Sequence, residues 1–392
     1  MPQREPGGSG ECTFPMKKQI KGTPWPLQRL VLDQLWKDTK GREKNGDPVR
    51  VAVIDTGVDN TNPQLTKAVN ASKGADFLPK DKNEGGSKDK PKRSDGTDDE
   101  VGHGTKAAGI IAARPIEGTG FVGLAPEAEI IPIRQNDAKG TGTPDTLARA
   151  IEKAVDEGAR VINISQDTKG RLRHSGLERA IAFAIKHDVV VVASAGNDGA
   201  DRELHNTYPA AYPGVLAVAA SDRNNERALF SQSGHFVDVA APGVEIVSTV
   251  PKGGQCVDNG TSFSAPYVAG VAALIRAKHP DWTQEQVVAQ IEQTAERGVN
   301  GRDPYIGWGV VDPVRALNED DHPIDHPTVD EKPAKNVEPP TVARLTQGET
   351  PQERRERFAT YALGTAAILV AATAGGAVVL RDRRRRNSSA GT

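Results

Sequence analysis

The sequence is poor in cysteine, in aromatic residues and in net charge. Its two cysteines, Cys12 and Cys256, exclude a disulfide-rich scaffold and a zinc site built from clustered cysteines. Aromatic residues make up 4% of the chain, too few to suggest a surface on which nucleic-acid bases stack. The formal net charge is -2, so no overall field attracts nucleic acid, and we expect no nucleic-acid partner.

The near-average composition, with 36% hydrophobic residues, hides a strong segregation along the 392 residues. The pattern predicts a polar N-terminal extension, a globular domain, a charged and Pro-rich linker, an uncharged segment and a basic tail. Their expected bounds are 1–24, 25–318, 319–357, 358–380 and 381–392.

The uncharged segment Phe358–Leu380 indicates a membrane-spanning helix, the alternative being a buried core helix. As a helix it would extend ~35 Å, enough to cross a hydrocarbon core of about 30 Å. The arginines of "RDRRRR" follow it and should stay cytoplasmic, which leaves the globular domain outside the cytoplasm. The chain opens "MPQREPGGSGEC" without an apolar signal region, so this orientation supposes a signal sequence upstream of this start or already removed.

Strand and helix patterns alternate through the globular domain and predict an α/β fold. Continuous apolar strands separated by amphipathic helices indicate a parallel sheet with helices on both faces. Strands are expected at 51–54, 129–135, 161–165 and 189–194, and helices at 143–158 and 176–188. In such sheets the functional site lies beyond the carboxyl ends of the strands, where Asp55, Ser165 and the turn "AGND" fall.

Four short stretches carry side chains that could take part in catalysis: "VAVIDTGVDN", "VGHGTKAAGIIAA", "SAGNDG" and "NGTSFSAPYVAGVAALIRA". Each has an ordinary structural explanation when it is taken alone. Asp55 suits a turn, His103 the start of a helix, Asn197 a left-handed turn and Ser262 a helix cap.

Together the four residues could form one catalytic site. A serine hydroxyl such as that of Ser262 becomes nucleophilic when a base, here His103, takes its proton. A buried carboxylate, here Asp55, orients the imidazole and stabilises its protonated form. The amide of Asn197 and the Ser262 N–H can stabilise an oxyanion. This explains why an apolar strand ends in a carboxylate.

The order Asp, His, Ser on an α/β sheet resembles that of the subtilisin-like serine proteases over roughly residues 48–317, including "GWGVVDPVRAL". The resemblance implies a three-layer fold with a mainly parallel central sheet. It also implies a serine endopeptidase that hydrolyses protein or peptide substrates through an acyl-enzyme, without a cofactor. The triad would be Asp55, His103 and Ser262, with Asn197 in the oxyanion hole.

The same resemblance implies that Ser165–Asp167 and Ala193–Gly196 border the substrate cleft. The substrate-binding residues would be Ser165, Gln166, Asp167, Ala195 and Gly196. Many relatives carry Ser-Leu-Gly where this chain has "SQD". Gln166 and Asp167 either favour basic substrate side chains or lie as solvated residues on the rim.

The flanking segments resemble those of the mycosins, membrane-anchored subtilisin-like proteases of actinobacterial type VII secretion systems. "PWPLQRLVLDQLW" precedes the Asp55 strand, and a linker, an apolar helix and a basic tail follow the domain. The resemblance implies an extension that wraps the domain, a single-pass protein of the cell membrane, and a secretion membrane complex as partner. Two alternatives are a structural stabiliser of that complex and a general extracytoplasmic subtilase.

Cys12 and Cys256 either form a bridge, which would pin the extension near Ser262, or remain two free thiols. The charged loop 73–101 is either a gate, a solvated insertion or a calcium site through Asp98, Asp99 and Glu100. It holds no convincing ligand set, so we expect no metal.

The tripeptide "DTG" at Asp55–Gly57 also occurs in aspartic proteases. That chemistry needs two carboxylates that share a proton, and a second DTG or DSG is absent from the sequence. The expected fold is also not all-β.

Overall fold

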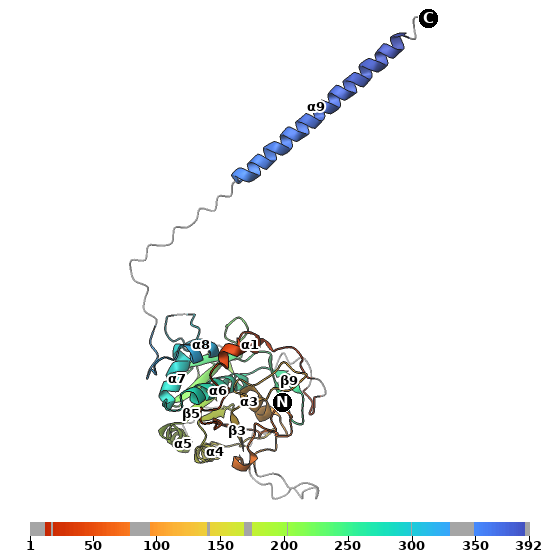
Figure 1. Cartoon of the computed structure of the whole chain (residues 1–392). Coiled ribbons are helices and arrows are strands. Elements are labelled where there is room, and N and C mark those ends of the chain that lie inside the picture. Colours follow the sequence, from red (N-terminus) through yellow and green to blue (C-terminus); the bar gives the residue numbers. More distant parts are fainter. Residues whose placement is uncertain are drawn as a thin grey trace. The chain divides into compact units, whose positions relative to one another are not determined.

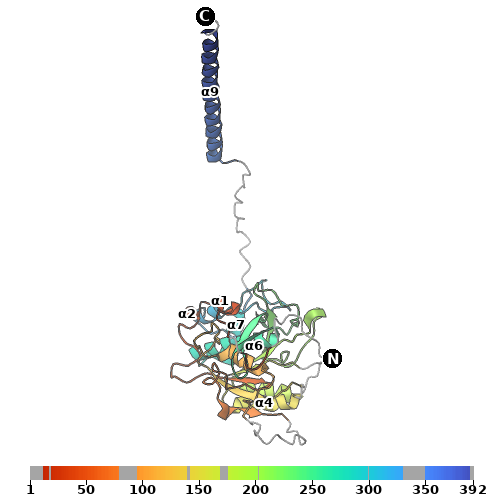
Figure 2. The same ribbon diagram turned by 90° about the vertical axis from the view of Figure 1, so that its right-hand side faces the viewer.

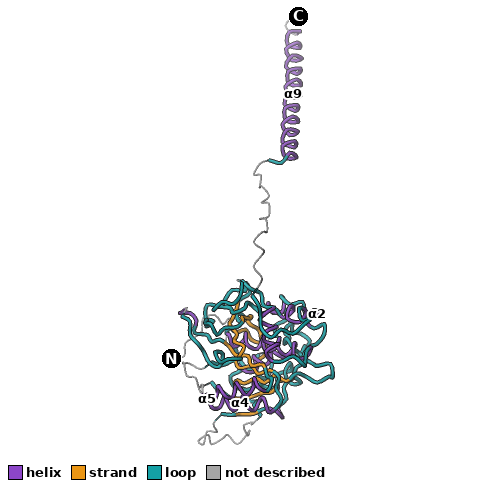
Figure 3. Tube along the Cα trace, turned by 90° about the vertical axis from the view of Figure 1, so that its left-hand side faces the viewer, coloured by secondary structure: helices purple, strands orange, loops and turns teal. Residues whose placement is uncertain are grey.

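A seven-stranded parallel sheet forms the centre of the globular unit (Figure 3). The computed structural model describes residues 12–16, 19–78, 95–138, 142–167, 175–201, 203–298, 300–329 and 349–388. The strand order is β2-β3-β1-β4-β5-β6-β7. The strands are β1 (Arg50–Asp55), β2 (Ala75–Asp76), β3 (Glu129–Arg134), β4 (Val161–Ile164), β5 (Val190–Ser194), β6 (Val215–Ser221) and β7 (Val239–Pro242). A separate antiparallel pair joins β8 (Ile246–Thr249) to β9 (Gln255–Asp258).

Helices cover both faces of the sheet, and the expected α/β fold is confirmed. The helices are α1 (Trp25–Gln28), α2 (Leu32–Leu35), α3 (His103–Ala112), α4 (Pro144–Asp156), α5 (Ser175–Lys186), α6 (Thr261–Lys278), α7 (Gln284–Gln293), α8 (Pro313–Asn318) and α9 (Pro351–Ser388), with short 3-10 turns at Ala71–Lys73 and Gly199–Asp201. Figures 1 and 2 show α4 on the opposite side of the sheet from α1 and α7.

The alternation of side chains along β1 explains these two layers. Val51 and Val53 point into the cluster formed with α3, α6 and α7, whereas Ala52 and Ile54 join the cluster formed with α4 and α5. All four side chains are fully buried. A strand buried on both faces has no reason to alternate with polar residues, and this is why the run "VAVI" is uniformly apolar.

The position of β1 in the sheet determines where a site can form. In the sheet β1 pairs with β3 on one side and with β4 on the other, and the chain crosses over β1 between these two strands, so β1 lies where the strand order reverses. A crevice forms beyond the carboxyl ends of the strands at such a point. Asp55 is the last residue of β1.

Helix α6 crosses the centre of one layer and is buried along nearly all of its 18 residues. Its close approach to the neighbouring loop depends on Gly270, because a Cβ there would lie 2.9 Å from Cβ of Leu124. Leu124 is 1% exposed and belongs to the same apolar cluster. The packing of Leu124 therefore helps to set the position of the helix that begins at Thr261.

The N-terminal extension lies against the β8–β9 pair. A disulfide joins Cys12 to Cys256, and the two Cα atoms are 6.0 Å apart. The Met16 N–H donates to the Gly253 carbonyl at 3.1 Å. Further along, the indole N–H of Trp25 donates to the Val244 carbonyl at 2.9 Å.

The chain divides into two compact units, Met1–Glu331 and Lys332–Thr392. Residues 330–348 of the linker expected at 319–357 lie outside the described residues. The first unit keeps residues beyond 318, since Asp320 pairs with Lys278 at 2.7 Å and the Thr328 N–H donates to Gln293 at 2.7 Å. At the other end, α9 already begins at Pro351. Composition shows that the region after 318 is Pro-rich and charged. Tertiary contacts decide that Asp320 and Thr328 pack against the first unit.

Helix α9 forms the described part of the second unit, and its 38 residues include the apolar segment expected at 358–380. Among the described residues it is the one helix long and apolar enough to cross a membrane, by length and composition. Its side chains are exposed, so it is not a core helix of the described structure.

Truncating Leu124 tests the packing beneath α6. Leu124→Ala should lower the free energy of unfolding by about 2–5 kcal/mol, because a cavity would remain where the side chain meets Gly270. Leu229→Ala is the matched control, since Leu229 is 74% exposed. Denaturant unfolding measures both variants. Equal small losses would show that Leu124 does not support the helix.

Candidate active site

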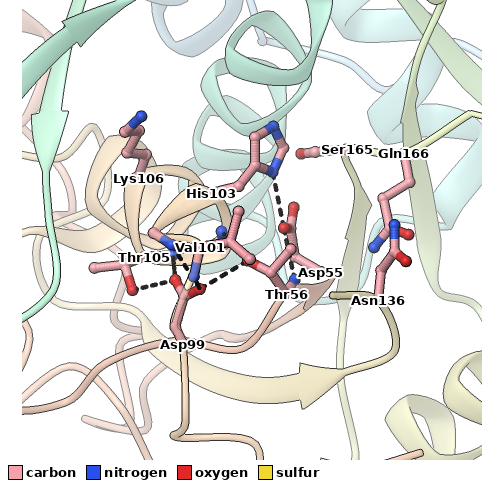
Figure 4. A network of polar contacts seen from close by, with 12 residues as sticks. Asp55, Thr56, Asp99, Val101, His103, Thr105, Lys106, Asn136, Ser165 and Gln166 are labelled. Atoms are coloured by element: carbon pink, nitrogen blue, oxygen red, sulfur yellow. Dashed lines mark hydrogen bonds and ion pairs between the residues drawn. The ribbon is translucent and has the colours of Figure 1, made fainter. Parts of the chain in front are cut away.

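The centre of the site is a buried carboxylate paired with an imidazole. Asp55 is 0% exposed, and its Oδ1 accepts a hydrogen bond from Nδ1 of His103 at 2.8 Å (Figure 4). The Thr56 N–H donates to the same oxygen at 2.7 Å. Because an ionised carboxylate only accepts, the Nδ1 of His103 carries the hydrogen. In the neutral imidazole the lone pair is then on Nε2.

His103 owes its position to the start of α3. Gly104 follows it, and a Cβ on Gly104 would lie 2.1 Å from the Gly57 carbonyl oxygen and 2.9 Å from Cβ of Asp55. Only glycine allows the first turn of α3 to approach the end of β1 so closely. The sequence "HGT" therefore brings the imidazole within hydrogen-bond distance of the carboxylate.

The surroundings of His103 favour its protonated form. Burial lowers the pKa of His103, but the charge of Asp55 and its hydrogen bond raise the pKa, and the net result lies above the ordinary value of 6.5. Lys106 opposes this shift and Asp99 adds to it. Because the side chain of His103 is 27% exposed, it can still be reached from outside the protein.

A second buried carboxylate, Asp99, holds the loop from which α3 begins (Figure 4). Its Oδ1 accepts from the Gly102 N–H at 2.7 Å and from the Thr56 hydroxyl at 2.9 Å. Its Oδ2 accepts from the Thr105 N–H at 2.9 Å and from the Thr105 hydroxyl at 2.6 Å. Asp99 thus joins the residue after Asp55 to the residues on both sides of His103.

Burial raises the pKa of Asp99 from 3.8 to about 6, although the hydrogen bonds from Thr105, Gly102 and Thr56 offset part of the effect. The folded protein therefore binds this proton more tightly than the unfolded chain does. The contribution of Asp99 to stability is largest at low pH and falls as the pH rises from about 4 to about 6.

Ser262 lies in the first turn of α6, beside Asn197. A Cβ on Gly260 would lie 2.9 Å from Oγ of Ser262 and 3.7 Å from Nδ2 of Asn197, so both polar atoms flank this glycine. The Oδ1 of Asn197 accepts from the Thr261 N–H at 2.9 Å. Because its oxygen is held in this way, the amide group of Asn197 keeps its N–H donors for another acceptor.

The ring of Phe263, the residue after Ser262, connects this turn to the imidazole. The centroids of the Phe263 and His103 rings are 5.3 Å apart. The structure therefore brings the residues from all four sequence stretches to one region, at the ends of β1 and β5 and the starts of α3 and α6.

The segments expected to bind substrate lie next to each other at the ends of β4 and β5. The hydroxyl of Ser165 accepts from Asn163 at 2.7 Å, and the Gln166 amide donates to the Ile54 carbonyl at 3.4 Å. Oδ2 of Asp167 lies 2.8 Å from the point that a Cβ on Gly196 would occupy.

The segment around Ala195 connects this region to the start of α6. The Ala195 carbonyl accepts from the Thr207 hydroxyl at 2.6 Å, and the Gly196 N–H donates to the Thr261 hydroxyl at 3.2 Å. Thr261 is the residue before Ser262, so these backbone contacts bring the expected substrate segment next to Ser262.

The N-terminal extension reaches the same region. A Cβ on Gly102, the residue before His103, would lie 2.4 Å from the ring of Phe14. Phe14 is two residues from Cys12, whose disulfide partner Cys256 lies on β9. The extension therefore contacts the residue next to His103 through Phe14, and the bridge two residues earlier joins the extension to β9.

Two of the three residues of the alternative calcium site, Asp98 and Asp99, have other partners. Asp98 pairs with Arg134 at 3.3 Å, and Asp99 accepts the hydrogen bonds described above. In the part of the chain that the structure describes, no group of three or more His, Cys, Asp or Glu side chains could hold a metal ion. Residues 79–94 of the expected loop lie outside the described residues.

Sequence reasoning missed the structural role of Asp99 and the contribution of Thr56. The sequence carried no clear signal, because Asp99 lies three residues before the N-cap Gly102 and its partners become visible only in the folded loop. Lys106 and Phe263 gave no such signal, since their partners come from distant parts of the chain.

A buried carboxylate–imidazole pair at the carboxyl edge of a parallel sheet defines a site for acid–base chemistry. The chain belongs to the Subtilase family (peptidase S8), whose profile matches residues 46–309. Subtilisin E of Bacillus subtilis (strain 168) is 39% identical over 267 residues, which are 68% of this chain and 65% of that protein. The chain thus spans 65% of the length of that relative.

A subtilisin of Bacillus pumilus is 38% identical over 68% of this chain and 90% of its own. Among solved structures, the MycP3 protease from the type VII (ESX-3) secretion system is similar, with a TM-score of 0.65 and 34% identity over 76% of this chain and 90% of that one. MycP1 from Mycobacterium smegmatis has a TM-score of 0.66 and 30% identity over 86% of this chain and 94% of its own. The closeness to mycosins expected from the flanking segments is confirmed.

Replacing Asp99 tests the network that holds His103. In Asp99→Asn an amide N–H₂ faces at least one backbone N–H, so the free energy of unfolding at pH 7 should fall by about 1–3 kcal/mol. Asp98→Asn is the control, because Asp98 is part of a more exposed ion pair worth about 0–1 kcal/mol. Chemical denaturation compares the two variants. A loss for Asp99→Asn no larger than that for Asp98→Asn would contradict the role assigned to Asp99.

Proposed function

We propose that this chain is a membrane-anchored serine endopeptidase that hydrolyses peptide bonds through Asp55, His103 and Ser262. The observation that carries the proposal is the 2.8 Å hydrogen bond from His103 Nδ1 to the fully buried Asp55. Membership of the Subtilase family supports the same assignment. No cofactor is needed for this chemistry, since the nucleophile, the base and the oxyanion donors are all side chains or backbone groups.

The proton transfers follow from the tautomer of His103. The imidazole donates from Nδ1 to Asp55, so the lone pair on Nε2 can accept the proton of the Ser262 hydroxyl as Oγ attacks the peptide carbonyl. The imidazolium is stabilised by the adjacent carboxylate and then donates its proton to the leaving amine. A water molecule activated by the same Nε2 hydrolyses the acyl-enzyme and regenerates Ser262.

Asn197 and the start of α6 supply the oxyanion donors in this proposal. The amide Nδ2 of Asn197 and the Ser262 N–H would stabilise the negative charge that develops on the peptide oxygen. The contact between Thr261 N–H and Asn197 Oδ1 supports this, because it leaves the N–H₂ group as the available part of the amide. The positive end of the 18-residue helix α6 acts in the same direction.

The substrate is a protein or peptide, bound along residues 165–167 and 195–196. The protein is anchored by α9, with the first unit outside the cytoplasm and the arginine-rich tail inside. The similarity to MycP3 and MycP1, proteases described as parts of type VII secretion systems, supports a role in processing proteins that such a system exports.

A structural role in the secretion complex is the second candidate. One similar structure is of MycP1, described as an essential component of the type VII (ESX-1) secretion system. A protease that is essential as a component can act by its surface as well as by cleavage. The two roles are separable, because the proposed chemistry depends on the hydroxyl of Ser262 and assembly would not.

Ser262→Ala is the decisive variant. A fluorophosphonate probe should label the wild-type protein at Ser262 and should not label Ser262→Ala, because the hydroxyl is the attacking group. Proteomic comparison of new protein termini in cells with either form should show cleavage products that only the wild type makes. Retained secretion in Ser262→Ala cells would assign assembly to the protein surface. Absence of labelling in the folded wild type would refute the endopeptidase.

The pH dependence of labelling and hydrolysis reports the protonation state of His103. The base must be neutral, and Asp55 raises the pKa of His103 above 6.5, so kcat/KM should rise with pH through a midpoint above 6.5. Asp55→Asn should lower kcat by ~10⁴-fold, because an amide neither enforces the Nδ1–H tautomer of His103 nor stabilises the imidazolium by its charge. A midpoint below 6.5 would contradict the pairing with Asp55.

Membrane orientation can be tested on intact cells. External protease should digest the first unit and leave an epitope placed after Arg386 protected, because the arginines favour the cytoplasmic side. A chain ending at 348 should appear in the soluble fraction, since it lacks α9. Digestion of the C-terminal epitope with protection of the first unit would reverse the orientation.

A further inference from the structure

Lys106 is an unusual residue in the core beside His103. It lies three residues after His103 on α3, so the two side chains occupy neighbouring positions on one face of the helix. Its Nζ pairs with Oδ2 of Asp258 at 2.6 Å, and the side chains are 8% and 35% exposed, respectively. A buried ammonium needs such a partner, because an unpaired charge in the interior is strongly unfavourable.

The ion pair joins the two chain segments that the proposed mechanism must align. Lys106 belongs to the helix that begins at His103, whereas Asp258 ends β9 four residues before Ser262. The Phe263 ring adds a second connection, since it lies 5.3 Å from the His103 ring and 5.8 Å from Nζ of Lys106. The short segment 258–263 therefore contacts α3 through both a charge and an aromatic ring.

Two further hydrogen bonds join α3 to β8, the strand that pairs with β9. The Ser248 hydroxyl donates to the Lys106 carbonyl at 2.6 Å, and the Thr249 hydroxyl donates to the Thr105 carbonyl at 2.9 Å. Both residues belong to β8, the partner of β9. These contacts fix the backbone of α3 on β8, and the Lys106–Asp258 ion pair adds a side-chain contact from α3 to the end of β9.

We infer that Lys106 and Asp258 form a positioning pair that aligns the helix bearing His103 with the segment bearing Ser262. The inference rests on the proposed function, because it assigns the pair a role in that reaction. Neither residue is given contact with substrate. The pair acts through His103 and Ser262, and the charge of Lys106 lowers the pKa of the imidazole.

The charged groups that face His103 make the effect of the ion pair measurable as a change in the pKa of the imidazole. Asp55 on β1, Asp99 before α3 and Lys106 on α3 all act on the imidazole, and Asp258 neutralises Lys106 from β9. Lys106 lowers the pKa of His103. Removing Lys106 should therefore raise that pKa, and removing the charge of Asp258 should lower it by leaving the ammonium without its counter-charge.

Lys106→Met and Asp258→Asn separate this role from a merely structural one. Both should lower kcat about ten- to a hundredfold with KM changed less than about twofold, because alignment matters in the transition state. The acid limb of kcat/KM should move to higher pH in Lys106→Met and to lower pH in Asp258→Asn, each by about half a unit to one unit. Loss of packing alone predicts no such opposite shifts.

Matched variants control the comparison. Lys73→Met removes a part-buried ion pair with Glu157, 3.0 Å long and outside the site, and should leave kcat and the acid limb unchanged. Lys106→Arg keeps the charge and should restore most of kcat. If Lys106→Met fails to fold, Lys106→Gln carries the same expectation.

A measurement that needs no turnover distinguishes a positioning role of the Lys106–Asp258 pair from a merely structural role. The imidazole of His103 can be titrated by NMR in a Ser262→Ala background, where Lys106→Met should raise and Asp258→Asn should lower the midpoint. Midpoints that match Lys73→Met, or that shift in the same direction, would overturn the positioning pair. A wild type that neither hydrolyses peptides nor reacts with the probe would instead overturn the proposed function.

Discussion

The hydrogen bond between the buried Asp55 carboxylate and His103 Nδ1 is the interaction on which the site depends. A carboxylate that is 0% exposed must be compensated by donors, and here the donors are an imidazole and the Thr56 N–H. The pairing fixes the tautomer of His103 and raises its pKa. It also requires α3 to begin close to the end of β1, and Gly104 makes that approach possible.

Several further contacts hold His103 at hydrogen-bond distance from Asp55. Asp99 ties the loop before α3 to Thr56, directly after Asp55. The β8–β9 pair holds α3 from the other side and also carries the segment that leads to Ser262. Each contact alone is an ordinary hydrogen bond or ion pair. Together they leave His103 little freedom relative to both Asp55 and the start of α6, which is the condition for efficient proton transfer.

The N-terminal extension is part of the same arrangement. The Cys12–Cys256 disulfide connects it to β9, and the Phe14 ring covers Gly102 beside His103. A disulfide between residues so far apart in the sequence restricts the unfolded chain as well as the folded one. The bridge expected as one of two possibilities is present in the structure, and it brings the extension to the region of the proposed active site.

The sequence by itself determined the class of fold and the chemical character of the site. The uniformly apolar run before Asp55, the helix patterns at 143–158 and 176–188, and the four motif stretches are local features, so they can be read without knowing what packs against them. The tertiary structure decided the rest. The partners of Lys106, Asp99 and Phe263, and the packing of residues up to 328, depend on segments up to hundreds of residues apart. No local pattern records such contacts, because only the folded sheet brings those segments together.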